Sequence, residues 1–317
     1  MRIVTVTLNP AIDMTIQLTE PLARGSVNLA ESAVETAGGK GVNVSSFLAD
    51  WGIASSVTGL IGTENVGIFE RLFREKNLDD RFVRVLGKTR VNVKIVDGDE
   101  TTDVNLPGLR ADAPALRSLE TALMALAEKR KGEPWTVALS GSLPKGCGAK
   151  TYADLIGKLR SAGARVMLDT SGEALKTALD APHKPLYAKP NRDELAAWTG
   201  RPITTEDALA QAAQTLLDGG MELLAVSMGG DGAAFFSRQG ALHAKKRLSR
   251  LSSTVGAGDS MVAGILAALD EGGDLERVAR LGTAFAAARV DADFKGGLGD
   301  RDAIESLASS VELRKIS

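Results

Sequence analysis

Residues 254–266 read Thr254-Val255-Gly256-Ala257-Gly258-Asp259-Ser260-Met261-Val262-Ala263-Gly264-Ile265-Leu266. The apolar second half predicts a helix, and the glycine-rich first half predicts the turn that leads into it. Backbone N–H groups at a helix start have no intrahelical partners, and the helix dipole adds positive potential there. The amides of Gly256, Ala257 and Gly258 are therefore expected to form an anion site suited to phosphate.

Asp259 belongs to the same turn. Its carboxylate could accept a proton from a substrate hydroxyl while the amides hold the charge of a transferring phosphoryl group. The same residues also suit simple helix capping by Asp259 or Ser260. Both interpretations stay open on these residues alone.

Along the rest of the chain, short apolar runs alternate with stretches of helical periodicity. The predicted strands are Ile3 to Leu8, Trp135 to Leu139, Val166 to Leu168, Leu186 to Ala188 and Leu223 to Val226. This alternation predicts β-α-β units and an α/β fold with a mostly parallel sheet. Polar and glycine-rich motifs follow these strands, at the edge where open parallel sheets bind ligands.

Two stretches, residues 12–37 and about 88–106, break the alternation and look extended. In the second stretch, Val91, Val93 and Ile95 alternate with other residues in the period-two pattern of a strand. We therefore expect one α/β domain over residues 1–317, with a small β-rich lid inserted discontinuously.

Composition excludes several classes of protein. The chain of 317 residues is 44% hydrophobic and 25% charged, with a net charge of −2, so no basic excess points to nucleic acid or to an anionic membrane. A single cysteine, Cys147, allows no internal disulfide and fits a reducing, cytoplasmic location. No apolar run reaches the length of a membrane span, and the first residues are too polar for a signal peptide.

Two motifs are candidates for nucleotide and metal binding. Ser227-Met228-Gly229-Gly230-Asp231-Gly232 follows a predicted strand and suits a loop at a nucleotide phosphate, or else a tight turn between two strands. In Lys189-Pro190-Asn191-Arg192-Asp193-Glu194, Asn191 and Glu194 would share a helix face. They could hold Mg²⁺ through water, or form a capping box.

Three further motifs suit a sugar phosphate. Gly38-Gly39-Lys40-Gly41-Val42-Asn43 would let a sugar approach the backbone, with Asn43 bonding hydroxyls and Lys40 a phosphate, or is a structural glycine turn. On a strand, Arg90, Asn92 and Lys94 point to one side and could clamp a second phosphate, or face solvent. Asp13, after Asn9-Pro10, could accept hydrogen bonds from sugar hydroxyls or belong to a turn.

The order of these motifs, together with Ser140-Gly141-Ser142-Leu143-Pro144, resembles the ribokinase-like (phosphofructokinase B) carbohydrate kinases over about residues 1–300. The resemblance implies a three-layer α/β/α fold with a small β-sheet lid. It also implies ATP-dependent phosphorylation of a small sugar phosphate, with Mg²⁺. Details at Thr89–Lys94 and Thr102–Asn105 are most similar to bacterial members that phosphorylate fructose 1-phosphate at the C6 hydroxyl.

The resemblance implies a role for each motif residue. Asp259 is the expected base, and the backbone of Gly256, Ala257 and Gly258 the anion hole. The expected substrate-binding residues are Asp13, Gly38, Gly39, Lys40, Asn43, Arg90, Asn92 and Ser140, with Lys40, Arg90 and Ser140 near the existing phosphate. The expected ATP-binding residues are Lys189, Ser227, Gly229, Gly230, Gly232 and Gly258. Asn191 and Glu194 would organise Mg²⁺ through water.

The resemblance also leaves alternatives. Tagatose 6-phosphate and fructose 6-phosphate remain rival substrates, although acidic Asp103 disfavours the latter because an arginine is expected near that position. A non-catalytic sugar-phosphate sensor is a third alternative, and the lack of G-x-G-x-x-G after the first strand disfavours a nicotinamide dehydrogenase. Ser253 replaces an aspartate that ribokinase associates with a monovalent cation. The family often pairs subunits through the lid, so a homodimer is expected.

Overall fold

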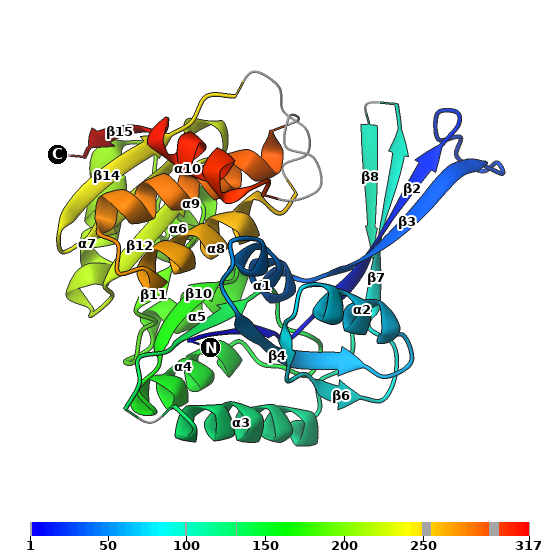
Figure 1. Cartoon of the computed structure of the whole chain (residues 1–317), viewed down its shortest axis with the longest axis horizontal. Helices are drawn as coiled ribbons and strands as arrows, with labels where there is room; N and C mark the ends of the chain where they lie inside the picture. The colour runs from blue at the N-terminus through cyan, green and yellow to red at the C-terminus, as the bar shows by residue number, and fades with distance from the viewer. Residues whose placement is uncertain (1, 99, 131, 249–254, 292–297, 317) are drawn as a thin grey trace.

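The computed structural model describes residues 2–98, 100–130, 132–248, 255–291 and 298–316. Its main sheet has the strand order β15-β14-β13-β12-β11-β10-β9-β1-β4-β5, with β6 paired to β4 (Figure 1). The strands are β1 (Ile3–Thr7), β4 (Ser55–Gly62), β5 (Asp79–Asp80), β6 (Val83–Val85), β9 (Thr136–Ser140), β10 (Arg165–Asp169), β11 (Tyr187–Ala188), β12 (Leu223–Ser227), β13 (Ala233–Ser237), β14 (Gly240–Lys245) and β15 (Glu312–Lys315). Pairing is parallel from β5 to β12 and antiparallel from β12 to β15.

Helices cover both faces of this sheet because its strands are apolar on both sides. One face packs against α1 (Lys40–Asp50), α8 (Ala257–Asp270), α9 (Leu275–Val290) and α10 (Arg301–Ser309). The other face packs against α3 (Ala113–Glu128), α4 (Thr151–Ser161), α5 (Gly172–Asp180), α6 (Arg192–Thr199) and α7 (Glu206–Asp218). A smaller apolar cluster joins α2 (Gly67–Glu75) to β4 and α1. The predicted α/β class with a mostly parallel central sheet is confirmed.

A separate four-stranded sheet has the order β3-β2-β7-β8. It is made of β2 (Ala11–Leu18), β3 (Ala30–Gly38), β7 (Arg90–Asp97) and β8 (Glu100–Asn105). Figure 1 shows it projecting from the main body, with its base next to α1 and α2. The chain leaves β1 through Asn9-Pro10 directly into β2, and β3 leads directly into α1, so this sheet is tied to the carboxyl edge of the main sheet.

Within the described ranges, no helix combines the length and the apolar character needed to cross a membrane.

Candidate active site

The carboxyl ends of three neighbouring parallel strands carry a row of buried polar side chains. Thr7 ends β1, Ser140 ends β9 and Asp169 ends β10. Ser140 lies opposite Asp169 in the strand register, and Thr7 follows the pair formed by Val6 and Leu139. The N-termini of α1 and α8 lie near this row. Lys40 of α1 contacts Asp169, and Asp259 of α8 contacts Asn43 of α1.

The glycine-rich turn begins α8 as predicted. Gly256 precedes the helix with a left-handed φ of 83°, which glycine adopts without a steric penalty. Gly256, Ala257 and Gly258 are partly exposed, so their amides are open to a ligand, whereas Asp259 in the same turn is only 7% exposed. Thr254, the first residue of the motif, and Ser253 lie outside the described residues.

The carboxylate of Asp259 sits in a setting that raises its pKa to about 6. Burial is the main cause, and the negative charge of nearby Asp169 adds to it. A hydrogen bond of 2.7 Å from the Asn43 side-chain amide to Asp259 Oδ2 acts in the opposite direction, as do the charges of Lys40 and Lys189. The turn therefore contains a carboxylate that is more basic than an ordinary aspartate.

Asp169 is the anchor of this cluster. Its two carboxylate oxygens pair with Lys40 Nζ at 3.1 Å and with Lys189 Nζ at 3.2 Å. Asp169 is 1% exposed, and its burial alone would raise its pKa, but the charges and hydrogen bonds of the two lysines hold that pKa below its usual range. For Lys40, burial works against the charged form, but Asp169 and Asp259 together raise its pKa. Sequence reasoning missed Asp169, and its only signal was its place at the end of a predicted strand.

The loop before α1 depends on glycines because the backbone passes close to other segments. Gly39 has a φ of 116°, and a Cβ there would lie 2.9 Å from Pro10 Cα. A Cβ on Gly38 would lie 2.5 Å from Asp13 Oδ2. Side chains at these positions would push the loop away from Asp13 and from β1.

Asp13, Asn92 and Arg90 form a second group at the base of the small sheet. The Asn92 side-chain amide donates a hydrogen bond of 2.9 Å to Asp13 Oδ1. Arg90 donates only to the backbone oxygens of Asn9 and Pro10, each at 3.4 Å, and within the described part of the chain it has no carboxylate partner. Burial lowers the pKa of Arg90, although the charge of Asp13 opposes this effect.

Lys40 and Arg90 have different partners within the described chain. The expectation that both flank the phosphate of the sugar stays a prediction: Lys40 pairs with Asp169, whereas Arg90 lies within the field of Asp13. The side chain of Lys40 is long and flexible, so it can reach the buried carboxylate of Asp169.

Ser140 and Thr7 have buried hydroxyls that no described residue bonds. Both lie at the carboxyl edge of adjacent strands, beneath the loop that carries Lys40. A buried hydroxyl without a partner costs stability, so such groups are expected where a ligand or water completes them.

Asn191 and Glu194 form the capping box that the sequence allowed. The Asn191 side chain accepts from the Glu194 amide at 2.7 Å, and Glu194 Oε2 accepts from the Asn191 amide at 2.8 Å. Glu194 also contributes to the field at Lys40, so its carboxylate is near the cluster. Among the described residues, no group of three or more histidine, cysteine or acidic side chains could hold a metal ion.

The segment from Ser227 to Gly232 connects two antiparallel strands, β12 and β13, so the turn that the sequence allowed is present. It lies beside the Asn191 segment, because the Ser227 amide donates to the Pro190 oxygen at 3.0 Å. Space is open on one side of the turn, since a Cβ on Gly229 or Gly230 would meet no atom within 4 Å. Lys189 connects this region to α8, because its Nζ lies 3.4 Å from a Cβ position on Gly258.

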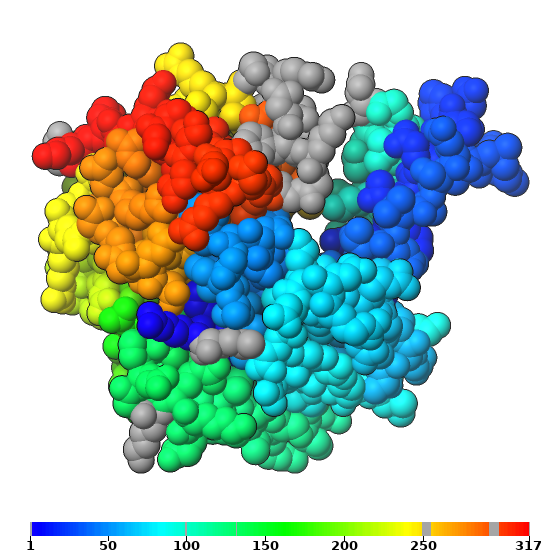
Figure 2. Space-filling view, viewed as in Figure 1, coloured from blue at the N-terminus to red at the C-terminus, as the bar shows by residue number. Residues whose placement is uncertain are grey.

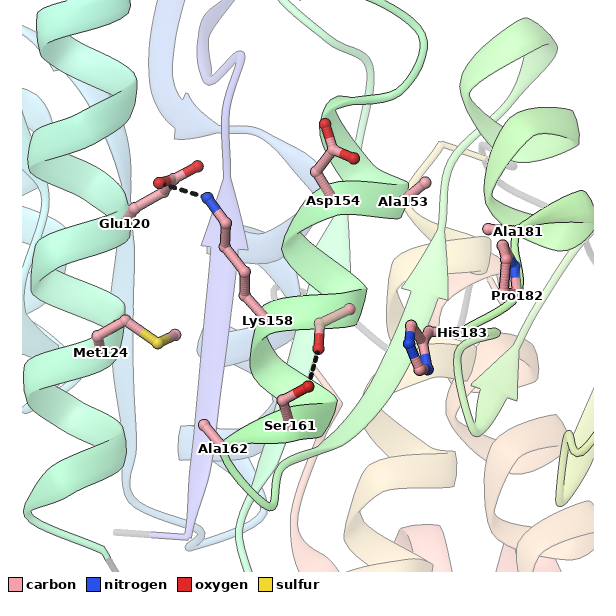
Figure 3. Close-up of a pocket in the computed structure, with 11 residues that line it drawn as sticks. Glu120, Met124, Ala153, Asp154, Lys158, Ser161, Ala162, Ala181, Pro182 and His183 are labelled. Carbon is pink, nitrogen blue, oxygen red and sulfur yellow. Dashed lines mark hydrogen bonds and ion pairs between the residues drawn. The ribbon is translucent and has the colours of Figure 1, made fainter.

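A cavity of about 800 Å³ lies elsewhere. Glu120 and Met124 of α3, Lys158 and Ser161 of α4, and His183 line it (Figure 3). Ser161 ends α4 just before β10 begins, so this groove is near the amino edge of the main sheet. The cluster around Asp169 lies at the carboxyl edge.

Replacing Asp169 by asparagine should destabilise the protein by roughly 3 kcal/mol, because removal of one partner leaves Lys189 buried without its ion pair. Urea unfolding measures the change. Asp180→Asn is the matched control, since Asp180 pairs with Lys176 on an exposed helix surface and its urea midpoint should move little. Equal midpoints for Asp169→Asn and wild type would contradict the anchoring role.

Comparison with known proteins agrees with this architecture. The profile of the pfkB family carbohydrate kinases matches residues 6–293. A 1-phosphofructokinase of Xanthomonas campestris pv. campestris is 47% identical over 296 residues, covering 92% of each chain. That of Rhodobacter capsulatus is 46% identical over 290 residues, covering 90% of this chain and 89% of its own. The structure of phosphofructokinase-2 from Escherichia coli in complex with substrates and products superposes with a TM-score of 0.87 at 28% identity, covering 98% of this chain and 99% of that one. The chain belongs to the pfkB family of carbohydrate kinases.

Proposed function

We propose that this kinase transfers the terminal phosphoryl group of ATP to the C6 hydroxyl of fructose 1-phosphate, giving fructose 1,6-bisphosphate and ADP. The observation that carries the proposal is Asp259, a buried and unusually basic carboxylate at the start of α8 beside open amides. The similarity to 1-phosphofructokinases over nine-tenths of the chain supports the choice of sugar.

Asp259 is proposed as the base. It takes the proton of the C6 hydroxyl as that oxygen bonds to the terminal phosphorus, and the bond from phosphorus to the bridging oxygen of ADP breaks. The amides of Gly256, Ala257 and Gly258 hold the charge of the transferring group, as is usual for phosphoryl transfer. Asn43 orients the carboxylate through its hydrogen bond of 2.7 Å.

The two lysines of the cluster are proposed to act at the phosphoryl end. Lys189 lies against Gly258, and Lys40 pairs with Asp169 and lies within the field of Asp259, so both provide positive charge where the terminal phosphate would arrive. Lys40 is therefore proposed for the transferred group and not for the phosphate that the sugar already carries.

The sugar phosphate is proposed to bind at Asp13, Asn92 and Arg90. Gly38, Gly39 and Ser140 are proposed to line the site between these residues and Asp259. Arg90 has only carbonyl contacts in the described chain, so its guanidinium is available to pair with the 1-phosphate. Asp13 keeps acceptor capacity for sugar hydroxyls, since Asn92 occupies only one of its oxygens.

The described side chains offer few oxygen ligands for Mg²⁺, so the ion would be held mainly by ATP and water. Glu194 is the nearest candidate, because one carboxylate oxygen serves the capping box and the other has no hydrogen bond from a described residue. One carboxylate plus phosphates is a common arrangement for this ion, which would neutralise phosphate charge. Asn191 would position Glu194, and Ser227, Gly229, Gly230 and Gly232 are proposed to line the ATP site.

ATP and sugar phosphates meet in the cytoplasm, which is the proposed location.

A homodimer through the small sheet is also proposed. Apolar side chains are exposed on or beside this sheet, including Val27 at 91%, Leu29 at 72% and Val34. The sheet stands out from the body in Figure 2, so a second copy could cover these side chains. Phosphofructokinase-2 from Escherichia coli has been solved in a tetrameric inhibited form.

Sedimentation velocity tests this assembly. Leu29→Asp combined with Val34→Asp should shift the protein from dimer to monomer, because a carboxylate in an apolar interface is costly. Leu86→Asp, at a more exposed position outside the small sheet, should leave the dimer unchanged. A monomeric wild type at micromolar concentration would contradict the proposal.

Asp259→Asn tests the proposed reaction. It nearly preserves shape but removes the base, so turnover of fructose 1-phosphate should fall at least about 100-fold. An ADP-release assay with fructose 1-phosphate, tagatose 6-phosphate and fructose 6-phosphate measures it. Asp302→Asn, an exposed aspartate in the first turn of α10, is the matched control and should be fully active. The Tm of Asp259→Asn should not fall, because a buried carboxylate is removed.

Full turnover in Asp259→Asn would exclude this base. A higher kcat/KM of the wild type for tagatose 6-phosphate or fructose 6-phosphate would reassign the sugar. No ADP release with any of the three sugars would favour the sensor.

The pH dependence provides a second test. Asp259 must be ionised to act as a base, and its pKa is about 6, so kcat/KM should fall as the pH is lowered through about 6. In Asn43→Ala the hydrogen bond that favours the ionised form is lost, so the acidic limb should move to higher pH. An acidic limb that does not move in Asn43→Ala would contradict this assignment.

A further inference from the structure

Arg289 is a cation at the candidate active site that the roles above do not use. It lies in the last turn of α9, partly buried, and its side chain crosses Gly256 at the start of α8. Its Nε lies 3.1 Å from the position that a Cβ on Gly256 would occupy. The glycine turn therefore leaves the space through which this side chain reaches the N-terminus of α8.

The two lysines of the neighbouring cluster are already engaged by its carboxylates. Lys40 and Lys189 provide two positive charges, and Asp169 and Asp259 provide two negative charges. Within the described residues, Arg289 makes no hydrogen bond or ion pair of its own. The Arg289 side chain lies beside a helix N-terminus that is itself positive, an unfavourable arrangement until an anion arrives.

The position of Arg289 complements that of Lys189. Lys189 Nζ approaches the turn at Gly258, and the Arg289 side chain approaches it at Gly256. The open amides thus have a cation at each end. A chain of several phosphates is longer than a single phosphate, so cations at both ends of the turn suit a polyphosphate.

We propose that Arg289 is a further residue of the nucleotide site, where its guanidinium pairs with a phosphate oxygen of ATP beside Gly256. The assignment rests on ATP being the phosphoryl donor. A guanidinium suits the role because it is always charged and presents several donors to phosphate oxygens.

A purely structural role is the alternative to test against. A positive side chain in the last turn of a helix is favourable in itself. Arg277, in the first turn of the same helix, has a structural role of another kind, because it pairs with Glu271 and Glu305 at 2.9 Å and 2.7 Å. The pair Arg289→Met and Arg277→Met therefore compares the same chemical change on the same helix.

The experiment measures MgATP binding by calorimetry without sugar, the KM for each substrate, and Tm. In Arg289→Met, the Kd for MgATP should rise about tenfold, while the KM for fructose 1-phosphate and the Tm stay close to wild type. In Arg277→Met, the Tm should fall while the Kd for MgATP stays unchanged. Added guanidinium ion, below denaturing concentration, should restore part of the activity of Arg289→Ala.

Wild-type affinity for MgATP in Arg289→Met overturns the assignment. So does a loss of Tm accompanied by equal losses of affinity for both substrates, because that is the signature of a structural residue. The calorimetric arm needs no sugar, so a failure of fructose 1-phosphate as substrate leaves this test intact. A wild-type protein that does not bind MgATP would overturn both proposals.

Discussion

The site depends on one buried carboxylate that two lysines share. Asp169 ends a central strand, and it is approached by Lys40 from the start of α1 and by Lys189 from just beyond β11. A buried ion pair repays its desolvation only when the geometry is good and the remaining bonding positions are filled. Asp169 has a lysine on each of its oxygens, so neither oxygen is left without a partner. It thereby fixes the start of α1 relative to the segment that leads into Asn191.

The same cluster explains how two aspartates acquire different chemistry. Asp169 receives both ammonium groups directly and stays ionised, whereas Asp259 receives a neutral amide from Asn43 and only the longer-range field of the lysines. Burial then dominates at Asp259 and makes it basic. Neighbouring carboxylates with divergent pKa values are a recurrent way to separate a structural charge from a reactive one.

Local features of the site could be predicted from the sequence, and long-range partners could not. Features formed by contiguous residues are all present in the structure. They are the glycine turn at Gly256, the capping box at Asn191 and the strand ends. The contact of Lys40 with Asp169 joins positions 129 residues apart, so the sequence alone did not indicate this partner for Lys40. Arg289 belongs to no motif, because only the packing of α9 against α8 brings it to Gly256.

Gly41, in the first turn of α1, lets this helix approach the end of β1 closely. A Cβ on Gly41 would lie 2.5 Å from Thr7 Oγ1, so the first turn of α1 rests directly on the end of β1. This close approach leaves the Thr7 hydroxyl buried and without a partner in the described chain, which costs on the order of 1 kcal/mol or more. The cost is offset because the short separation lets Lys40 reach Asp169, while Asn43, one turn further along α1, reaches Asp259. A bulkier residue at Gly41 would relieve none of this cost, since it would lift α1 and withdraw both side chains together.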